Sequence, residues 1–467
     1  MNPIVRCRLD AELVLFDLPA KTSYRLYLKL SVRNPEQAKL LRFHGHGGGL
    51  PERLHAAIEM PDGSLHVPRG ARRFVREELV KDGLALGIAE DAMSDGATVP
   101  RRAVEQSRTP RDYQAKALQI QQREKQGLVV LGCGGGKTLL GVVVVCHRPI
   151  TTLIIVPTID LIAQWVEELQ FHGFDPGVVA DGRDERHRGI VVGTIDSLLP
   201  ILEADAALDD GVWGARFGRV IIDEAHRTAA PTMQRALRFL PARERLGLTA
   251  TPNREDGLTD LVTWAFGDTL LTRTPKELIA AGYLMPATIV AIATGFTWSY
   301  DGPEKKRLST LERDLEEDLG RNMLIADTVA AKAKAGAICL VLVRARAHAK
   351  ELAAMICLRG IEAKAVTGQT AKKKRAGSIA DLTAGTLSVM IATSLADEGL
   401  NIPRLSLVAL AAPRRSEGKT TQRLGRLLRL WPGKAPELYD FVDEDVDTLA
   451  RRAQARRKVY RDVGLLP

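Results

Sequence analysis

Short apolar runs recur along the chain from about residue 100. Each run is bounded by polar residues or glycine, and longer amphipathic stretches separate one run from the next. Strands that are covered on both faces are almost continuously apolar, so this pattern predicts a parallel sheet wrapped by helices. The runs are Leu128–Leu131, Leu153–Val156, Ile190–Val192, Val220–Ile222 and Leu246–Leu248.

The same pattern returns after a polar and charged stretch at residues 296–320. Two sheets therefore follow each other in the chain, and each has about the size of one α/β domain. We expect lobe one at residues 101–285, a connector at 286–335 and lobe two at 336–445. The second series of runs is Cys339–Val343, Val389–Ala392, Leu405–Leu410 and Leu438–Val442.

Residues 1–100 follow a different pattern and predict a small α+β accessory module of their own, with DNA recognition as a candidate role. A helix is expected over Arg72–Lys81, because Gly83 follows it as a stop signal. Four stretches favour extended structure through their apolar residues and the turn signals between them. They are Leu13–Phe16, Tyr24–Val32, Ala56–Met60 and Leu65–Val67.

The charge of the chain favours a polyanionic partner. It contains 66 Lys and Arg residues against 57 Asp and Glu residues, which gives a net charge of +9. Cations that neutralise phosphates release condensed counterions, so nucleic acid is a candidate partner, although a basic protein that is merely soluble has the same balance. The basic turn Val67–Arg73 has two interpretations of equal weight: it contacts a DNA backbone, or it is a solvated turn. For the basic C-terminal helix at 446–467 we favour contact with DNA, and we expect Val446, Leu449, Ala453 and Tyr460 to dock it on lobe two.

The cysteine pattern and the apolar runs argue against several other classes of protein. None of the five cysteines has C-x-x-C spacing, which disfavours zinc ribbons and iron–sulfur clusters. An odd number of cysteines without a disulfide framework fits a reducing cytoplasm, where we expect the protein. The N-terminus lacks the apolar core of a signal peptide, and the run Leu139–Cys146 is too short to span a bilayer, so we expect no membrane partner.

A glycine-rich loop directly follows the first apolar run of lobe one. Its glycines allow successive backbone N–H groups to point at one phosphate, and a helix that begins there adds the positive end of its dipole. We expect Lys137 to reach the β- and γ-phosphates of ATP and Thr138 to bind magnesium. The loop departs from the strict P-loop pattern, because Leu131 stands in place of a glycine, and the valine-rich segment Leu139–Val145 favours a strand where a P-loop needs a helix. The glycines are Gly132, Gly134, Gly135 and Gly136.

An acidic pair, Asp223 and Glu224, follows the apolar run Val220–Ile222. Nucleotide sites in open α/β sheets form at the carboxyl ends of strands, which is where this pair is expected to lie. We expect Asp223 to hold magnesium and Glu224 to orient or deprotonate the attacking water, because phosphoryl transfer needs positioning more than covalent chemistry.

Together with further motifs in the same order, these two resemble the motifs of the superfamily 2 helicases over residues 108–445. The resemblance implies that Arg111 and Gln114 bind adenine, and that Arg423 and Arg426 face the γ-phosphate. It also assigns Gly399 and Gln422 to the nucleotide site. The resemblance also implies that three further residues couple ATP hydrolysis to movement of the lobes. They are His226, Thr249 and Thr251.

Contacts with the nucleic-acid strand are implied by the same resemblance. They fall on the motifs that follow the strands of both lobes, and on the Arg-Glu-Asp triplet at Arg254–Asp256. This triplet resembles the one that follows the same motif in the XPB-like branch of the superfamily. That branch includes UvsW-type helicases and restriction-type translocases. The residues implied to contact nucleic acid are Pro157, Thr158, Gln164, Thr194, Arg254 and Thr393.

The resemblance implies two RecA-like lobes in tandem and a nucleic-acid-stimulated ATPase that uses ATP and Mg²⁺. Members of the XPB-like branch act mainly on duplex or branched DNA, so a DNA helicase or translocase is expected, with single-stranded DNA as a further substrate. The stretch 296–320 lies where XPB proteins carry a thumb-like insertion, but it is short. Three alternatives stay open: an RNA helicase, a motor subunit that works with a nuclease or other partner in a restriction, defence or phage recombination complex, and a non-catalytic DNA-binding adaptor.

Overall fold

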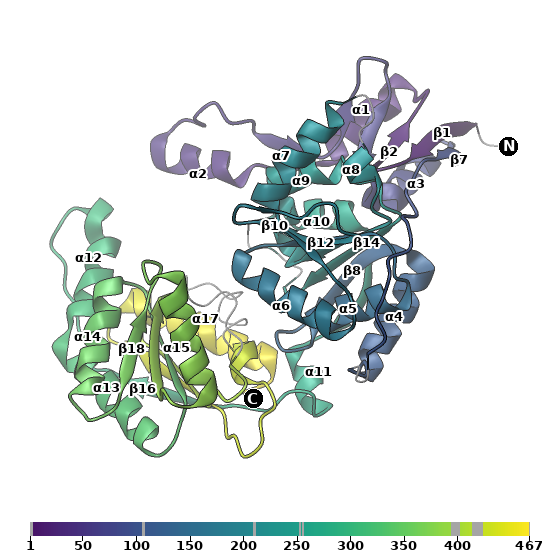
Figure 1. The fold of residues 1–467 in the computed structure, drawn as a ribbon. Helices are drawn as coiled ribbons and strands as arrows, with labels where there is room; N and C mark the ends of the chain where they lie inside the picture. Colours follow the sequence, from purple (N-terminus) through teal and green to yellow (C-terminus); the bar gives the residue numbers. More distant parts are fainter. Residues whose placement is uncertain are drawn as a thin grey trace. The chain divides into compact units, whose positions relative to one another are not determined.

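The computed structural model describes residues 3–104, 108–208, 212–251, 254, 256–393, 402–412 and 424–466. The chain divides into two compact units (Figure 1). The first unit contains Met1–Leu131 and Gly136–Thr272, and it holds the N-terminal module together with lobe one. The second unit contains Gly132–Gly135 and Arg273–Pro467, and it holds lobe two.

The sheet of lobe one has the strand order β11-β10-β12-β9-β13-β14-β8-β15. All neighbours from β10 to β8 pair in parallel, so their carboxyl ends meet at one edge of the sheet and their amino ends at the other. Each predicted apolar run of lobe one is confirmed as a buried strand. The strands are β8 (Gln126–Leu131), β9 (Thr152–Val156), β10 (Gly177–Ala180), β11 (Arg183–Asp184), β12 (Ile190–Thr194), β13 (Arg219–Asp223), β14 (Glu244–Thr249) and β15 (Thr269–Arg273).

Helices cover both faces of this sheet (Figure 1). One face carries α4 (Asp112–Glu124), α5 (Lys137–His147) and α6 (Ile159–Phe171). The other face carries α7 (Ile195–Ala206), α8 (Val212–Ala215), α9 (Pro231–Leu237) and α10 (Thr259–Phe266). The helix predicted after the glycine-rich loop is therefore confirmed: burial of the valines of α5 against the sheet overrides their preference for strands.

The N-terminal module is an α+β unit, as predicted, with a mixed sheet of order β5-β6-β2-β1-β7. The strand expected over Tyr24–Val32 is wrong, because this segment forms the end of α1 followed by β3. Its buried residues Leu26 and Leu30 lie four positions apart, which is the spacing of residues on one face of a helix. The elements are β1 (Ile4–Leu9), β2 (Glu12–Leu15), α1 (Ala20–Lys29), β3 (Ser31–Arg33), α2 (Pro35–His44), β4 (Arg53–His55), β5 (Ile58–Glu59), β6 (Leu65–Pro68), η1 (Arg69–Ala71), α3 (Arg72–Lys81) and β7 (Ala85–Asp91).

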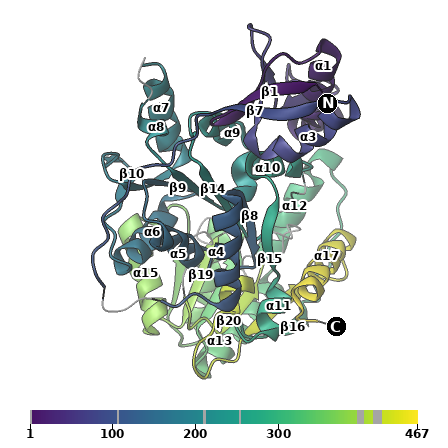
Figure 2. The ribbon, with the colours of Figure 1, turned by 90° about the vertical axis from the view of Figure 1, so that its right-hand side faces the viewer.

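Two buried arginines join this module to lobe one, where η1 lies against α10 (Figure 2). Arg245, on β14, donates to the carbonyl of Ala11 in the module at 3.1 Å, and also to carbonyls of lobe one. In the opposite direction, Arg69 of the module donates from Nη2 to the carbonyl of Ala242 in lobe one at 2.7 Å. Both arginines are at most 3% exposed, so the module and lobe one share one core.

The sheet of lobe two is parallel throughout, with the order β16-β21-β20-β17-β19-β18. Helices α13 and α14 pack on one of its faces, and α15 and α17 contact the sheet as well. The strands are β16 (Thr288–Ala293), β17 (Cys339–Val343), β18 (Ala363–Val366), β19 (Val389–Thr393), β20 (Leu407–Leu410) and β21 (Glu437–Val442). The helices are α11 (Pro275–Ala280), α12 (Glu304–Glu317), α13 (Leu319–Lys334), α14 (Arg346–Cys357), α15 (Lys372–Ala384) and α17 (Asp447–Val463).

The segment expected as a connector at 286–335 belongs to this unit. Its first part, β16, pairs with β21 along its whole length and forms the edge of the sheet. Its polar middle part forms the amphipathic helix α12, whose Leu311 and Leu315 pack against Val446 and Leu449 at the start of α17. The charged composition of 296–320 therefore reflects the solvated face of a docked helix.

The C-terminal helix α17 docks on lobe two as expected, through the buried Val446, Leu449, Ala453 and Tyr460. One of its arginines is turned inward: Arg456 is 2% exposed and pairs with Asp440 at 2.7 Å, so this residue does not face a nucleic acid. None of the helices within the described residues is both long enough and apolar enough to cross a membrane.

Replacing Arg245 with Met should destabilise the first unit by about 3 kcal/mol. The methionine cannot donate to the buried carbonyls of Ala11, Leu237 and Leu240, which would be left without their donor. The thermal melting temperature and the rate of proteolysis between module and lobe one measure the effect. Arg123→Met is the matched control, because Arg123 pairs with Glu124 on the surface. Equal melting temperatures of the two variants would contradict the anchoring role.

The stability of lobe two should fall in mild acid because of His348. This side chain is 2% exposed and bonds Asn322 at 2.9 Å, and burial lowers its pKa from 6.5 to about 3. As pH falls below 6.5 the unfolded chain binds a proton that the folded histidine does not, so stability is lost, by about 2 to 3 kcal/mol between pH 7 and pH 4.5. His348→Gln should flatten this dependence in urea unfolding, whereas His187→Gln, on the exposed surface, should leave it unchanged.

Candidate functional site

The motifs predicted from the sequence meet at the carboxyl edge of the lobe-one sheet. The glycine-rich loop follows β8, Asp223 ends β13, and Thr249 ends β14. The motif that starts at Pro157 follows β9, and Thr194 ends β12. Because these strands are parallel and adjacent in the order β12-β9-β13-β14-β8, segments up to 117 residues apart (249 minus 132) are brought to one edge.

The glycine-rich loop is closed by a buried glutamine. Gln114, near the start of α4, is fully buried, and its Nε2 donates to the carbonyl of Gly136 at 3.0 Å. Its Oε1 accepts from the backbone N–H of Arg111 at 2.9 Å. Gly136 has φ +74°, and a Cβ there would lie 2.6 Å from the Gln114 amide, so only glycine fits between the loop and α4. The start of α5 at Lys137 is thereby fixed.

The acidic pair lies beside Lys137. The ammonium of Lys137 donates to Oε1 of Glu224 at 2.6 Å, with both side chains less than a fifth exposed. Glu224 has φ +51°, an uncommon conformation for a residue with a side chain, and its N–H donates to the Asp223 carboxylate at 2.9 Å. The sharp turn at the end of β13 therefore points two adjacent carboxylates toward the P-loop.

Burial and mutual charge give the two carboxyls different pKa values. Burial raises the pKa of Asp223 above its ordinary value, while Lys137 opposes that shift. Burial acts in the same direction on Glu224, but the attraction of Lys137 and its hydrogen bond outweigh it and lower the pKa. Glu224 is thus the ionised partner of Lys137, whereas the charge of Asp223 gains from any cation that binds beside it.

Helix α6 holds both expected magnesium ligands through two consecutive side chains. Gln164 donates from Nε2 to the hydroxyl of Thr138 at 2.8 Å. Trp165 is fully buried and donates from its indole N–H to Oδ2 of Asp223 at 2.9 Å. Its ring packs on Gly141 of α5, where a Cβ would lie 2.3 Å from the ring. The sequence predicts Gln164 as a nucleic-acid contact, but the structure points its amide at the nucleotide site.

The coupling residues form a short chain behind the acidic pair. Nδ1 of His226 lies 3.2 Å from the hydroxyl of Thr249, which in turn accepts from the N–H of Thr251. Burial lowers the pKa of His226, so this imidazole is neutral at neutral pH. Arg254 donates from Nη1 to the carbonyl of His226 at 2.6 Å and pairs with Asp256, so this predicted nucleic-acid contact also braces the acidic motif.

Two of the predicted strand-contacting threonines have hydroxyls without a hydrogen-bond partner among the described residues. These are Thr158, which precedes α6, and Thr393, which ends β19 in lobe two. The hydroxyl of Thr194 lies 3.2 Å from that of Ser197. Buried hydroxyls that lack a partner in the protein are candidates for contact with a ligand.

Part of the predicted site lies outside the described residues, namely Gly399, Gln422 and Arg423. Arg426 belongs to lobe two and is partly buried. Sequence reasoning missed the role of Trp165 as a partner of Asp223. Its position next to Gln164 on one amphipathic helix is the signal that could have indicated it.

Two family matches cover this part of the chain. Residues 107–254 match the family described as type III restriction enzyme, res subunit. Residues 321–430 match the helicase conserved C-terminal domain. The first match covers the strands from β8 to β14 of lobe one, and the second covers those from β17 to β20 of lobe two.

Two curated relatives each match 68% of the chain. The chain is 29% identical over 357 residues to the DNA 3'-5' translocase XPB2 of Sulfurisphaera tokodaii, covering 68% of this chain and 78% of the relative. It is 29% identical over 336 residues to the DNA 3'-5' helicase XPB of Kineococcus radiotolerans, covering 68% and 57%. The chain thus spans less than two thirds of the Kineococcus protein.

Solved structures share the fold at low sequence identity. The S. cerevisiae protein Dbp5 bound to RNA matches 77% of this chain and 89% of its own, with a TM-score of 0.57 and 16% identity. The type ISP restriction-modification enzyme LlaBIII bound to DNA matches 77% of this chain and 30% of its own, with a TM-score of 0.56 and 16% identity. With the tandem RecA-like lobes and the ordered motifs, the family matches and the XPB relatives identify the chain as a superfamily 2 helicase of the XPB-like branch.

Proposed function

We propose that the protein is an ATP-driven DNA translocase or helicase that acts on duplex or branched DNA. The observation that carries this proposal is the arrangement of Lys137, Asp223 and Glu224 at the carboxyl edge of lobe one, with Lys137 2.6 Å from Glu224. The XPB relatives act on DNA by name, and the net charge of +9 favours a polyanion.

The residues at this edge fit ATP and Mg²⁺. Thr138 and the buried Asp223 supply two oxygen donors for Mg²⁺, which usually takes its other ligands from water and phosphates. In keeping with this, no group of three or more His, Cys, Asp or Glu side chains in the described part of the chain is placed to hold a metal by itself. When bound, ATP supplies the phosphoanhydride that is cleaved, and Mg²⁺ neutralises charge on its phosphates.

The protein residues have separate tasks in this proposal. Lys137 exchanges Glu224 for a phosphate when nucleotide binds, and the released Glu224 carboxylate orients a water or takes its proton. Arg111 and Gln114 lie where the adenine-binding motif of the family falls. Arg426 and Arg423 are assigned to the γ-phosphate from lobe two, so hydrolysis would depend on both lobes. His226, Thr249 and Thr251 would pass the change at the acidic pair to neighbouring segments.

Nucleic acid is proposed to contact the edge of lobe one beside the ATP site. Pro157, Thr158 and Thr194 follow adjacent strands there, and the hydroxyl of Thr158 lacks a partner within the described residues. Thr393 has the same feature in lobe two. Contacts of this kind with phosphates position the strand without reading its sequence.

ATP hydrolysis should be stimulated by duplex DNA, and Lys137→Ala should abolish both basal and stimulated rates. The substitution removes the cation that would hold the phosphates. The measurement is phosphate release with duplex DNA, single-stranded DNA and RNA at two salt concentrations, with Lys116→Ala, on α4 outside the loop, as the control. Stronger stimulation by RNA would favour the RNA helicase, and absence of hydrolysis in the wild type would favour a non-catalytic adaptor.

Trp165→Phe should lower the stimulated rate about tenfold and raise the Mg²⁺ concentration for half-maximal activity. Phenylalanine keeps an aromatic ring in the core, although it lacks the outer indole atoms that pack on Gly141. It removes the donor to Asp223, and hydrogen bonds to charged groups contribute about 1.5 to 3 kcal/mol. Trp264→Phe is the matched control, because Trp264 is also buried, in α10. A Mg²⁺ dependence identical to that of the control would show that Trp165 is only a packing residue.

A further inference from the structure

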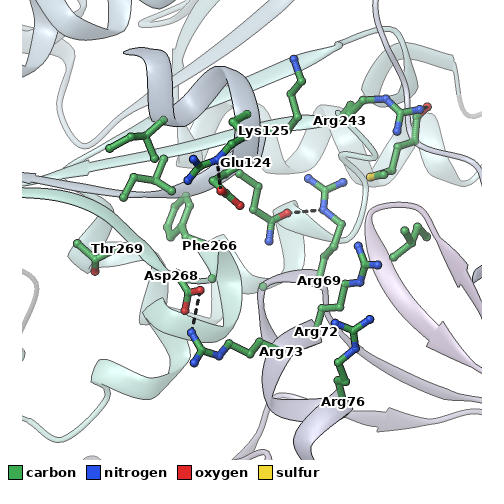
Figure 3. Close-up of a pocket in the computed structure, with 18 residues that line it drawn as sticks. Arg69, Arg72, Arg73, Arg76, Glu124, Lys125, Arg243, Phe266, Asp268 and Thr269 are labelled. Atoms are coloured by element: carbon green, nitrogen blue, oxygen red, sulfur yellow. Dashed lines mark hydrogen bonds and ion pairs between the residues drawn. The ribbon is translucent and has the colours of Figure 1, made fainter. Parts of the chain in front are cut away.

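A basic pocket lies between the N-terminal module and lobe one, both in the first unit (Figure 3). Its volume is about 710 Å³, which is within the range of ligand sites. It borders Lys125, just before β8, and Arg243, just before β14. The pocket therefore lies at the amino edge of the lobe-one sheet, the edge opposite to the Lys137–Glu224 site.

The walls of the pocket are fixed by the core that the module shares with lobe one. Gly70 presses on the end of α10, where a Cβ would lie 2.3 Å from the backbone nitrogen of Gly267. The guanidinium of Arg69 donates to Gln126 at 2.7 Å and to the carbonyls of Asp10 and Ala242. The backbone at Gly70 and the side chain of Arg69 are thus held in place before any ligand arrives.

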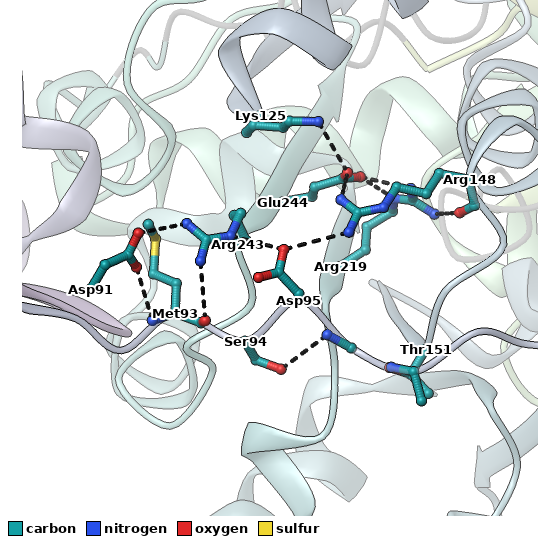
Figure 4. A network of polar contacts seen from close by, with 12 residues as sticks. Asp91, Met93, Ser94, Asp95, Lys125, Arg148, Thr151, Arg219, Arg243 and Glu244 are labelled. Atoms are coloured by element: carbon teal, nitrogen blue, oxygen red, sulfur yellow. Dashed lines mark hydrogen bonds and ion pairs between the residues drawn. The ribbon is translucent and has the colours of Figure 1, made fainter.

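The charge of the pocket is not balanced from within. Seven of its eighteen lining residues are Arg or Lys, and two are Asp or Glu. Four of the seven cations have acidic partners in the protein. Arg243 pairs with Asp91 at 2.7 Å and Asp95 at 2.9 Å, in the network of Figure 4. The other three pairs are Arg73 with Glu77, Arg123 with Glu124 and Lys125 with Glu244. By contrast, the side chains of Arg72 and Arg76 have no ion pair or hydrogen bond to any residue that the structure describes.

The positions of Arg72 and Arg76 lower the stability of helix α3. Arg72 and Arg76 lie one turn apart on α3, where like charges repel. Arg72 and Arg73 are in the first turn, which contains no acidic residue, although the positive end of the helix dipole favours acids there. Figure 3 shows Arg69, Arg72 and Arg76 following one another along one wall, with Lys125 across the pocket. A bound anion would offset both unfavourable terms.

The chemistry of the lining favours phosphates of a nucleic-acid backbone. Arginine presents a planar fork that matches two phosphate oxygens, and six of the seven cations are arginines. Phe266, the aromatic residue among the described lining, is fully buried and offers no ring face for a base. We propose that this pocket is a second DNA contact that holds backbone phosphates independently of base sequence, an inference that rests on the proposed function.

The double variant Arg72→Ala/Arg76→Ala tests the proposal, with Arg33→Ala/Lys39→Ala as control. Both variants remove two exposed cations from the N-terminal module, so both reduce the net charge from +9 to +7 (nine minus two), but the control pair lies outside the pocket. Binding of fluorescein-labelled duplex DNA is followed by anisotropy over a series of salt concentrations.

The pocket variant should bind duplex DNA about tenfold more weakly, and its salt dependence should lose about one to two counterions, equally for two unrelated sequences. Basal ATP hydrolysis should stay at the wild-type rate, because the ATP site lies at the other edge of the sheet. Arg72→Glu/Arg76→Glu should bind more weakly still while melting no lower than the wild type, which separates lost binding from lost folding.

Three outcomes would overturn the proposal. If the pocket variant matches the control in affinity and salt slope, the pocket does not bind DNA, while the proposed function stands. If the pocket variant loses binding of inorganic tripolyphosphate or polyglutamate but keeps duplex DNA, the site serves a free polyanion or an acidic protein. If the wild type does not bind duplex DNA, both this proposal and the proposed function fail.

Discussion

The parallel direction of the strands in lobe one determines what each edge of its sheet can do. The carboxyl ends carry the loops, and five of these loops bring the P-loop, the acidic pair and the strand-contacting threonines together. The amino ends carry charged residues that close the sheet: β13 begins with Arg219 and β14 with Glu244, a buried pair at 2.6 Å. The carboxyl edge thus carries the candidate ATP site, whereas at the amino edge the charges at the starts of β13 and β14 are neutralised by an internal network (Figure 4).

Charge balance distinguishes structural networks from candidate ligand sites in this protein. Glu244 is surrounded by Arg219 and Arg148, and each charge has an opposite charge within the protein. Asp223 is buried with a raised pKa and depends on Lys137 for compensation, which Lys137 already gives to Glu224. A bound cation, as proposed for Mg²⁺, would stabilise the charge of Asp223 at the carboxyl edge. On the opposite side of the sheet, the exposed side chains of Arg72 and Arg76 likewise have no acidic partner among the described residues, but their charge is solvated.

The sequence was sufficient to predict both parallel sheets, because strands covered on both faces are apolar throughout. It was also sufficient to predict that the glycine-rich loop and the acidic pair lie at strand ends, because each comes directly at the end of an apolar run, β8 or β13. The prediction of a strand over Tyr24–Val32 was wrong because the apolar residues there alternate only in part. Strand β1 was not predicted, although its buried residues Val5, Cys7 and Leu9 alternate with exposed or half-buried positions. The polar composition of α12 likewise hid a helix that buries Leu311 and Leu315.

What the sequence could not supply is the set of contacts between distant segments. The basic pocket combines residues near positions 70, 125, 243 and 268, and no local pattern relates them. The same holds for Gln164, because its position in a motif suggests a strand contact, while its hydrogen bond to Thr138 depends on how α6 packs on α5. A motif thus predicts which edge of the sheet a residue reaches, and packing decides what it contacts there.

Helix α6 gives a physical route from bound nucleic acid to the reacting end of ATP. Thr158 precedes its first turn, and Gln164 and Trp165 follow six and seven positions later, which is about 10 Å along a helix. These two side chains bond Thr138 and Asp223, so a shift of the rigid helix displaces both expected magnesium ligands at once. The proposed strand contact at Thr158 would therefore act on the metal through one rigid element. On this proposal, stimulation by nucleic acid would act on the ATP site through α6.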